Sequence, residues 1–148
     1  MADPDLQALL RTVLTELAGE AGDLGYMHES LPALTSFIGE FAAPGFVCLM
    51  RGLPPTPPTS HPGVEGITTA WNDYGGAFER VRAGLVDIRE SPTHTVVIVD
   101  QVATTRHGGV QISQPSAMVF EFADGQIARV EFHLDRAEAL RVAGLEPG

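Results

Sequence analysis

The chain has 148 residues and a formal net charge of −10, with 44% hydrophobic and 19% charged residues. This length and composition are those of a globular domain with a sizeable core, and the acidic balance argues against the basic surface that a nucleic-acid partner requires. No apolar run approaches the ~20 residues of a membrane-spanning helix, so neither a nucleic acid nor a membrane is an expected partner.

The cysteine content and the first residues bear on the cellular compartment. Cys48 is the single cysteine, so no disulfide can form within the chain, which fits a reducing environment. The opening residues MADPDLQALL are acidic rather than basic and lack the pattern of a signal peptide. These observations predict a cytoplasmic protein.

Two helices are expected in the N-terminal part. An Asp-Pro pair is a helix-start signal, and the leucines and valine that follow it recur at helical spacing, which predicts an amphipathic helix laid on a core. Ser30 is the expected N-cap of a second helix that ends before Pro44-Gly45. The linker between the two helices contains Tyr26 and His28.

A strand, a loop and a third helix are predicted next. The short apolar run 46–50 is typical of a buried strand. The segment 51–62 holds five prolines and is predicted to be an extended loop, because proline fixes φ and removes a hydrogen-bond donor. A third helix is expected over 63–81, with an interruption at Gly75-Gly76, since glycine is unfavourable inside a helix.

The segments 81–89, 92–105 and 110–122 are predicted to be antiparallel strands. Residues 96–99 read Val-Val-Ile-Val, so this strand is apolar toward both faces and needs cover on both sides. A single sheet in so short a chain is expected to lack that cover on one face. The sequence therefore predicts a homodimer formed through the outer face of the sheet.

The clearest local pattern is a hairpin near the C-terminus. Asp124-Gly125 predicts a tight turn, because glycine tolerates the positive φ that such turns require. After the turn, Val130 and Phe132 alternate with Glu131 and His133. This period of two is typical of a strand with one buried face, so the two polar residues are expected to point outward.

A short helix is predicted after the hairpin. Asp135 and Glu138 have the spacing of a capping box, and Gly144 stands where a helix ends. Helices followed by antiparallel strands and a final helix make an α+β fold, and the absence of a composition shift predicts a single domain over residues 1–148.

The stretch FADGQIARVEFHLDRAEALRVAGL, with the helix start Gly63-Val64-Glu65-Gly66-Ile67, resembles the SnoaL-like proteins of the nuclear transport factor 2-like superfamily over roughly the last 85 residues. That superfamily includes ketosteroid isomerase and limonene epoxide hydrolase. The resemblance implies a curved, mostly antiparallel sheet wrapped around N-terminal helices, a cone-shaped apolar pocket and a short C-terminal helix. It identifies the fold rather than the reaction, because the superfamily places many chemistries on one scaffold.

Strand alternation proposes which side chains enter the implied pocket. Taking Phe132 as inward-facing fixes the parity of the neighbouring strands, and the first strand and third helix add further candidates. The expected substrate-binding residues are Cys48, Met50, Tyr74, Phe78, Val99, Gln101, Gln114, Ser116, Met118 and Phe132. The expected partner is a small apolar molecule.

Acid-base groups are scarce in this set. The Asp-Arg-Asp set of limonene epoxide hydrolase is absent, because those positions hold Gln101, Val99 and Phe132. No histidine has metal-ligand spacing with another ligand residue, so neither a metal nor another cofactor is expected. The residues considered as proton carriers are Tyr26, His28 and Tyr74.

Two functions fit these observations. The first is a small-molecule enzyme that resembles SnoaL-like cyclases and isomerases and uses cofactor-free acid–base chemistry on an apolar oxygenated substrate. The second is a non-catalytic module of the same fold, which binds a small ligand or works through its dimer surface. Neutral polar groups can line an apolar pocket at lower cost than a charge, so the two functions differ in whether an ionisable side chain enters the pocket.

Overall fold

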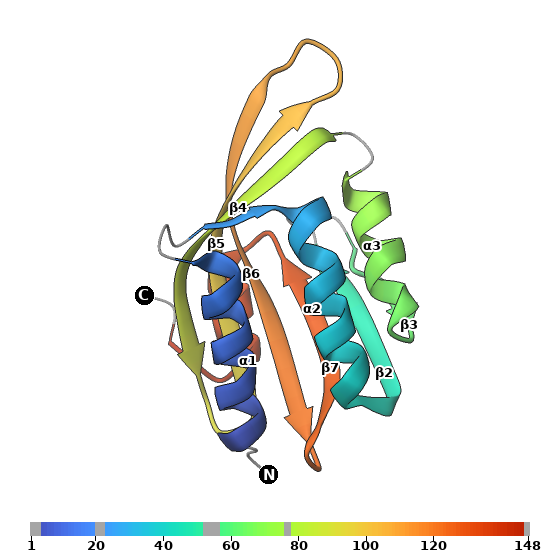
Figure 1. Ribbon diagram of the computed structural model, residues 1–148, viewed down its shortest axis with the longest axis vertical. Helices are drawn as coiled ribbons and strands as arrows, with labels where there is room; N and C mark the ends of the chain where they lie inside the picture. The colour runs from blue at the N-terminus through green and yellow to red at the C-terminus, as the bar shows by residue number, and fades with distance from the viewer. Residues whose placement is uncertain (1–3, 20–22, 52–56, 76–77, 147–148) are drawn as a thin grey trace.

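A computed structural model describes residues 4–19, 23–51, 57–75 and 78–146 (Figure 1). The elements in chain order are α1 (Pro4–Ala18), β1 (Asp23–Tyr26), α2 (Met27–Phe41), β2 (Ala42–Arg51), β3 (Thr59–Pro62), α3 (Glu65–Gly75), β4 (Phe78–Glu90), β5 (His94–Thr105), β6 (Gln111–Ala123), β7 (Gln126–His133) and α4 (Arg136–Val142). The strands form one curved sheet in the order β1-β4-β5-β6-β7-β2-β3. All neighbours are antiparallel except β2 and β7, which run parallel. The predicted α+β architecture is confirmed.

Helices cover both faces of the sheet. α1, α2 and α3 pack on its concave face and enclose the main core (Figure 1). The short helix α4 packs on the convex face, where Leu140 joins a second apolar cluster with Val96 and Ile98 of β5. Val97 and Val99, which alternate with them, belong to the main core. The doubly apolar strand is therefore covered on both sides within one chain, which removes the reason for which the sequence predicted a partner subunit there.

The predicted hairpin between β6 and β7 is confirmed. Asp124 has φ 54° and Gly125 has φ 75°, the pair of positive values that a two-residue hairpin turn needs. Beyond a bulge between Glu121 and Phe122, which shifts the register by one residue, Met118 lies opposite Phe132. Both side chains belong to the main core, as the alternation predicts.

The predicted C-terminal helix and its N-cap Asp135 are also confirmed. Asp135 caps α4, because its Oδ1 accepts hydrogen bonds from the backbone N–H groups of Ala137 (3.1 Å) and Glu138 (3.3 Å). Gly144 follows the helix with φ 76°, and Leu145 N–H donates to the carbonyl of Leu140 at 2.8 Å. This left-handed ending satisfies carbonyls that the helix itself leaves unpaired.

The linker between the first two helices differs from the prediction. It contains the strand β1, whose last residue Tyr26 pairs with Arg82 of β4, and α2 begins directly afterwards at Met27. Ser30 is therefore not the N-cap. Its hydroxyl donates to the carbonyl of Leu24, which ties the first turn of α2 to β1.

The proline-rich segment 51–62 is not a loop throughout. Arg51 is the last residue of β2, and Thr59–Pro62 form β3, which pairs with β2 at the edge of the sheet. An edge strand tolerates proline because one side of its backbone needs no partner. Residues 52–56 lie outside the described part of the chain. Gly66 in α3 lies so close to this strand that an added Cβ would be 2.4 Å from the carbonyl oxygen of His61.

The third helix is shorter than predicted. It ends at Gly75, at the glycine pair, and β4 begins at Phe78. Phe78 and Val81, which the helical spacing placed on this helix, therefore lie on a strand. β4 gains a long antiparallel ladder with β5, and this pairing outweighs the local helical pattern. None of the helices in the described residues is long and apolar enough to span a membrane.

A buried polar cluster lies on the convex face where β7 meets β2. Glu131 is only 2% exposed, and its Oε1 lies 2.6 Å from Arg51 Nε and 3.1 Å from His133 Nε2. Arg129 Nε is 3.4 Å from Oε2 of the same carboxylate. Burial by itself raises the pKa of Glu131, but hydrogen bonds from His133 and Arg51 and the positive charge of Arg51 outweigh it and lower this pKa to about 2.

We predict that Glu131→Gln lowers the free energy of unfolding by about 1–3 kcal/mol, because it removes a buried carboxylate that accepts hydrogen bonds from Arg51 and His133. The measurement is urea unfolding at pH 7. Glu138→Gln is the matched control, since Glu138 forms an exposed pair with Arg141, and such pairs contribute at most about 0.5 kcal/mol.

The same cluster predicts a pH dependence. A carboxylate with a lowered pKa stabilises the folded state above its ordinary pKa of 4.5, and this contribution is lost as the pH falls toward about 2. The difference in stability between the wild type and Glu131→Gln should therefore shrink across that interval. A difference that stays constant from pH 7 to pH 2 would contradict the assignment.

Candidate functional site

A cavity lies between the concave face of the sheet and the helices α2 and α3. Its volume is about 20 Å³, which is room for about one water molecule. Its wall is drawn from seven elements and the residue after β7: Met27, Met50, Trp71, Ala83, Val99, Gln101, Ser116, Ala117, Met118, Phe132, His133 and Leu134. Most of this surface is apolar, as expected for a small-molecule site.

One polar pair stands in the apolar wall. Gln101 Nε2 donates to Ser116 Oγ at 2.8 Å, from the adjacent strands β5 and β6. Ser116 is 2% exposed, so the pair is shielded from solvent on the serine side. A hydroxyl can both donate and accept hydrogen bonds, and an amide carries both donors and an acceptor. The pair can therefore orient a carbonyl or hydroxyl group of a ligand.

Two aromatic rings form another part of the wall. The ring centroids of Trp71 on α3 and Phe132 on β7 are 6.2 Å apart, with their planes tilted by 56°. This is within the range of favourable tilted aromatic pairs. Trp71 is partly buried against the main core and lies on the cavity.

His133 is the one titratable residue in the described wall. The imidazole is 1% exposed and contacts the carboxylate of Glu131, on the face opposite to Phe132. The predicted outward parity of Glu131 and His133 is thus correct, but both residues are buried rather than at the surface. No carboxylate belongs to the part of the wall that the structure describes. The polar side chains of that wall are Gln101, Ser116 and His133.

Six of the residues expected in the pocket lie on the cavity, and three with described side chains do not. The six are Met50, Val99, Gln101, Ser116, Met118 and Phe132. Phe78 packs against the main core at the start of β4. Gln114 has the expected parity, opposite Gln101, but its amide donates to the carbonyls of Pro115 and Leu134, each at 2.9 Å. This closes the end of β6 against the segment after β7.

Cys48 also lies behind the wall rather than on it. It has no exposed surface and belongs to the main core. Burial raises the pKa of its thiol to about 12, so it stays protonated at neutral pH. A thiol in this state is a poor nucleophile, and Cys48 acts as a small apolar residue.

The three residues considered as proton carriers lie on three different elements. Tyr26 ends β1, His28 lies in the first turn of α2, and Tyr74 lies near the end of α3, but their side chains are outside what the structure describes. Their positions along the chain are informative. Tyr26 and His28 flank Met27 of the wall, and Tyr74 follows Trp71 of the wall by three residues, which is about one turn of α3.

Sequence reasoning missed half of the wall for identifiable reasons. Ala83 is paired with Gln101, so extending the alternation to one more strand would have found it. Met27 was missed because the second helix was expected to begin at Ser30. Ala117 and His133 have the outward parity, and Leu134 follows the end of β7, so strand alternation does not select any of the three.

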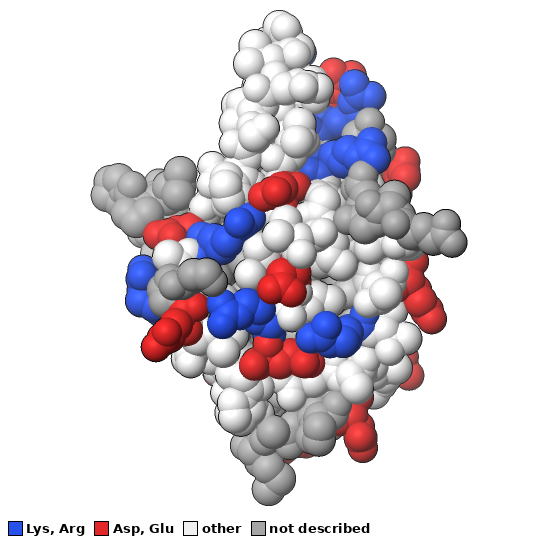
Figure 2. Space-filling view, turned by 90° about the vertical axis from the view of Figure 1, so that its left-hand side faces the viewer, with Lys and Arg blue, Asp and Glu red and all other residues white. Residues whose placement is uncertain are grey.

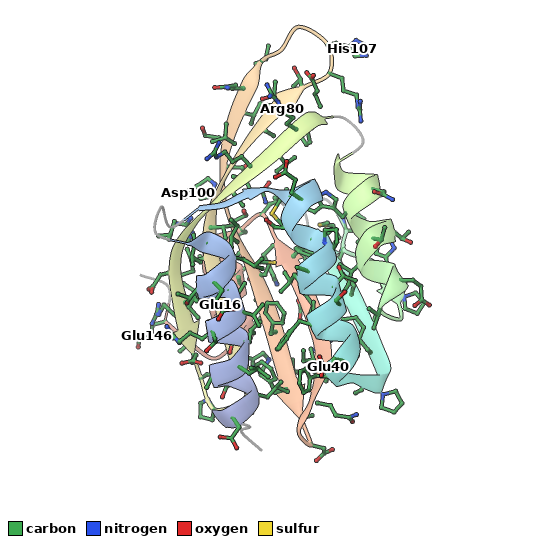
Figure 3. All side chains as sticks on the ribbon, viewed as in Figure 1. Glu16, Glu40, Arg80, Asp100, His107 and Glu146 are labelled. Atoms are coloured by element: carbon green, nitrogen blue, oxygen red, sulfur yellow. The ribbon has the colours of Figure 1, made fainter. Side chains whose placement is uncertain are left out.

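The acidic side chains labelled in Figure 3 lie outside this interior. Asp100 and Glu146 are at the left edge of the ribbon, and Glu16 and Glu40 are exposed on α1 and α2. The space between the helices and the sheet is filled mainly by carbon atoms (Figure 3). Among the described residues, no group of three or more His, Cys, Asp or Glu side chains has an arrangement that could hold a metal ion.

Comparison with solved structures shows the fold. A putative SnoaL-like polyketide cyclase from Jannaschia sp. CCS1 is similar over 97% of this chain and 94% of its own, with a TM-score of 0.60 and 15% identity. A putative hydroxylase from Streptomyces galilaeus covers 95% of this chain and 99% of its own, with a TM-score of 0.55 and 14% identity.

A third structure is a protein with a ketosteroid isomerase-like fold from Catenulispora acidiphila DSM 44928, in complex with trimethylamine. It matches 75% of this chain and 82% of its own, with a TM-score of 0.51 and 13% identity. At these identities the likeness concerns the fold alone. No match was found among curated protein sequences.

The sequence profile of the SnoaL-like domain matches residues 35–130, which is more than half of the chain. The matched segment runs from α2 to β7 and so includes most of the cavity wall. The chain belongs to the SnoaL-like domain family.

Proposed function

We propose that this protein binds a small apolar molecule with a carbonyl or hydroxyl group in the cavity between the sheet and α2 and α3. The observation that carries this proposal is the Gln101–Ser116 pair, which stands in an otherwise largely apolar wall. A few polar groups in an otherwise apolar wall are typical of small-ligand sites, where they fix the orientation of the bound molecule. The rings of Trp71 and Phe132 offer flat apolar surfaces for the rest of the ligand.

We further propose that the bound molecule is a substrate, converted by cofactor-free acid–base chemistry as in SnoaL-like cyclases and isomerases. The similarity to a putative polyketide cyclase supports this class of reaction. A proton carrier would then come from Tyr26 or His28, which flank the wall residue Met27, or from Tyr74, three residues after Trp71. One domain over residues 1–148 performs this function, and the buried thiol of Cys48 fits the reducing conditions of a cytoplasm.

The second candidate is binding without turnover. One observation favours it: the described wall contains a neutral polar pair and no carboxylate, and its titratable residue, His133, already contacts the carboxylate of Glu131. Native mass spectrometry of freshly purified protein separates the two functions. A ligand retained and recovered unchanged after incubation supports binding alone, whereas its conversion to a product of altered mass or retention time supports an enzyme.

We predict that Gln101→Leu weakens binding of the retained ligand by about 10- to 100-fold, because the ligand loses a hydrogen-bond partner in an apolar site. The measurement is isothermal titration calorimetry. Gln114→Leu is the control, since Gln114 bonds the backbone near the cavity without lining it. Equal loss in both variants would contradict a ligand-orienting role for Gln101.

For the enzyme, we predict that one of Tyr26→Phe, His28→Gln and Tyr74→Phe lowers kcat by about 10²- to 10⁴-fold, the range for removal of a general acid or base. Each change removes a titratable group and keeps most of the side chain, so the affinity for the ligand should stay within about threefold. His107→Gln, at an exposed turn far from the cavity, should leave kcat unchanged. Unchanged kcat in all three variants would rule out these carriers.

We also propose a homodimer through the convex face of the sheet. Val86 is 52% exposed and borders a groove with Ile98 and Leu140, beside α4. Figure 2 views the side of the molecule that carries Asp100 in Figure 3, and arginine and acidic side chains are interspersed on it. A surface of mixed sign allows two copies to approach without the repulsion expected from a net charge of −10.

The dimer predicts a specific effect of charge at Val86. Val86→Asp should shift the mass measured by light scattering from two chains to one, because a charge buried in an apolar interface is strongly unfavourable. Leu9→Asp is the matched control, since Leu9 is also an exposed apolar residue but lies on α1 at 42% exposure. A wild-type protein that elutes as one chain at all concentrations would refute the dimer.

A further inference from the structure

The cavity is too small for the ligand that the proposed function requires. Its volume of about 20 Å³ holds one water molecule, whereas pockets for small organic ligands measure roughly 300–1,000 Å³. Binding therefore requires part of the wall to move. The wall residues differ in how easily they can do so.

The strands are the least mobile part of the wall. β5 and β6 are paired without interruption from His94 opposite Glu121 to Thr104 opposite Gln111. In the central part of these strands, the main core packs on the concave face and the cluster under α4 packs on the convex face. Moving either strand would break ladder hydrogen bonds and expose apolar surface at the same time.

The aromatic residues and the polar pair are also constrained. Trp71 and Phe132 are rigid rings in mutual contact, so enlarging the space between them means displacing a whole ring. Gln101 and Ser116 are hydrogen-bonded to each other across two strands. Neither set gains volume by a simple change of rotamer.

Three methionines and Leu134 make up the remaining large apolar side chains of the wall. Met27, Met50 and Met118, three of the four methionines in the chain, line the cavity. They come from α2, β2 and β6, so they approach the cavity from three separate elements. An unbranched side chain with three rotatable bonds and a polarizable sulfur changes rotamer at low cost and keeps favourable contact with aromatic rings.

We propose that Met27, Met50 and Met118 form an adjustable wall. These side chains change rotamer to admit a flat apolar ligand, and they set the size of the largest ring system that the cavity accepts. This inference rests on the proposed binding of a small apolar molecule. Selectivity is then divided between two sets of residues. Gln101 and Ser116 recognise the polar atom, and the methionines determine how many rings can accompany it.

The test uses a variant in which all three methionines are replaced by leucine. Leucine has a similar volume, so the change is tolerated in cores, but its branched side chain has fewer rotatable bonds. The probes are the aromatic ketones indanone, fluorenone and benzanthrone, which share a carbonyl and have two, three and four rings. Trp71 is the single tryptophan and lies on the cavity, so quenching of its fluorescence reports the affinity for each ketone.

We predict that Met27→Leu/Met50→Leu/Met118→Leu binds indanone within about threefold of the wild type but binds benzanthrone at least ~10-fold more weakly, as expected when a pocket discriminates by size. Ile98→Leu is the control, because it changes side-chain branching in the convex-face cluster and should leave all three affinities unchanged. A parallel thermal unfolding curve confirms that the triple variant is folded.

The outcomes separate this inference from the function beneath it. If the wild type binds the ketones and the triple variant keeps the same ratio of affinities between indanone and benzanthrone, the adjustable wall is wrong and binding stands. If the wild type binds none of the ketones, the proposed binding fails for this ligand class and the inference falls with it. Methyl ¹³C spectra of labelled methionine add a direct readout, since the signals of all three wall methionines should shift on binding.

Discussion

The register of β6 against β7 is the constraint on which the rest of the structure depends. A turn with positive φ at Asp124 and Gly125 begins the pairing. A bulge between Glu121 and Phe122 then shifts it by one residue, so that Met118 faces Phe132 on the concave side. Side chains alternate with a period of two, so a slip of one residue would exchange Phe132 and Glu131 between the faces. The cavity would then receive a carboxylate and the convex face a buried phenylalanine.

In this register, two kinds of polar group lie on opposite faces of the sheet. The concave side holds a neutral amide–hydroxyl pair, which can stand in an apolar wall without a counter-charge. The convex side holds Glu131 with its cationic neighbours, where the low pKa of the carboxylate reflects hydrogen bonds and charge that overcome burial. His133 connects the two, because it lines the cavity and its Nε2 lies 3.1 Å from Oε1 of Glu131.

The position of α4 explains how so short a chain covers a sheet apolar on both faces. Helices α1 to α3 bury the concave face, and the capped C-terminal helix places Leu140 over Val96 and Ile98. A groove beside Val86 remains exposed on this side. A second copy bound there would cover apolar surface next to the cluster that α4 already buries.

The sequence by itself determined the features that depend on local chemistry. The hairpin turn, the cap of α4, the parity of Val99, Met118 and Phe132 and the family resemblance could all be predicted, because turn residues, caps and alternation act over a few neighbouring residues. Tertiary structure alone decided the features that depend on partners distant in sequence. Phe78 belongs to a strand because β5 offers it a ladder, and Thr59–Pro62 form a strand because β2 has a free edge.

Tertiary structure also determined which residues form the cavity wall. Met27 and Trp71 reach it because α2 and α3 cross the concave face, and no local pattern encodes where helices cross a curved sheet. The size of the cavity also follows from packing between distant side chains, which is set by the whole fold rather than by any segment of it.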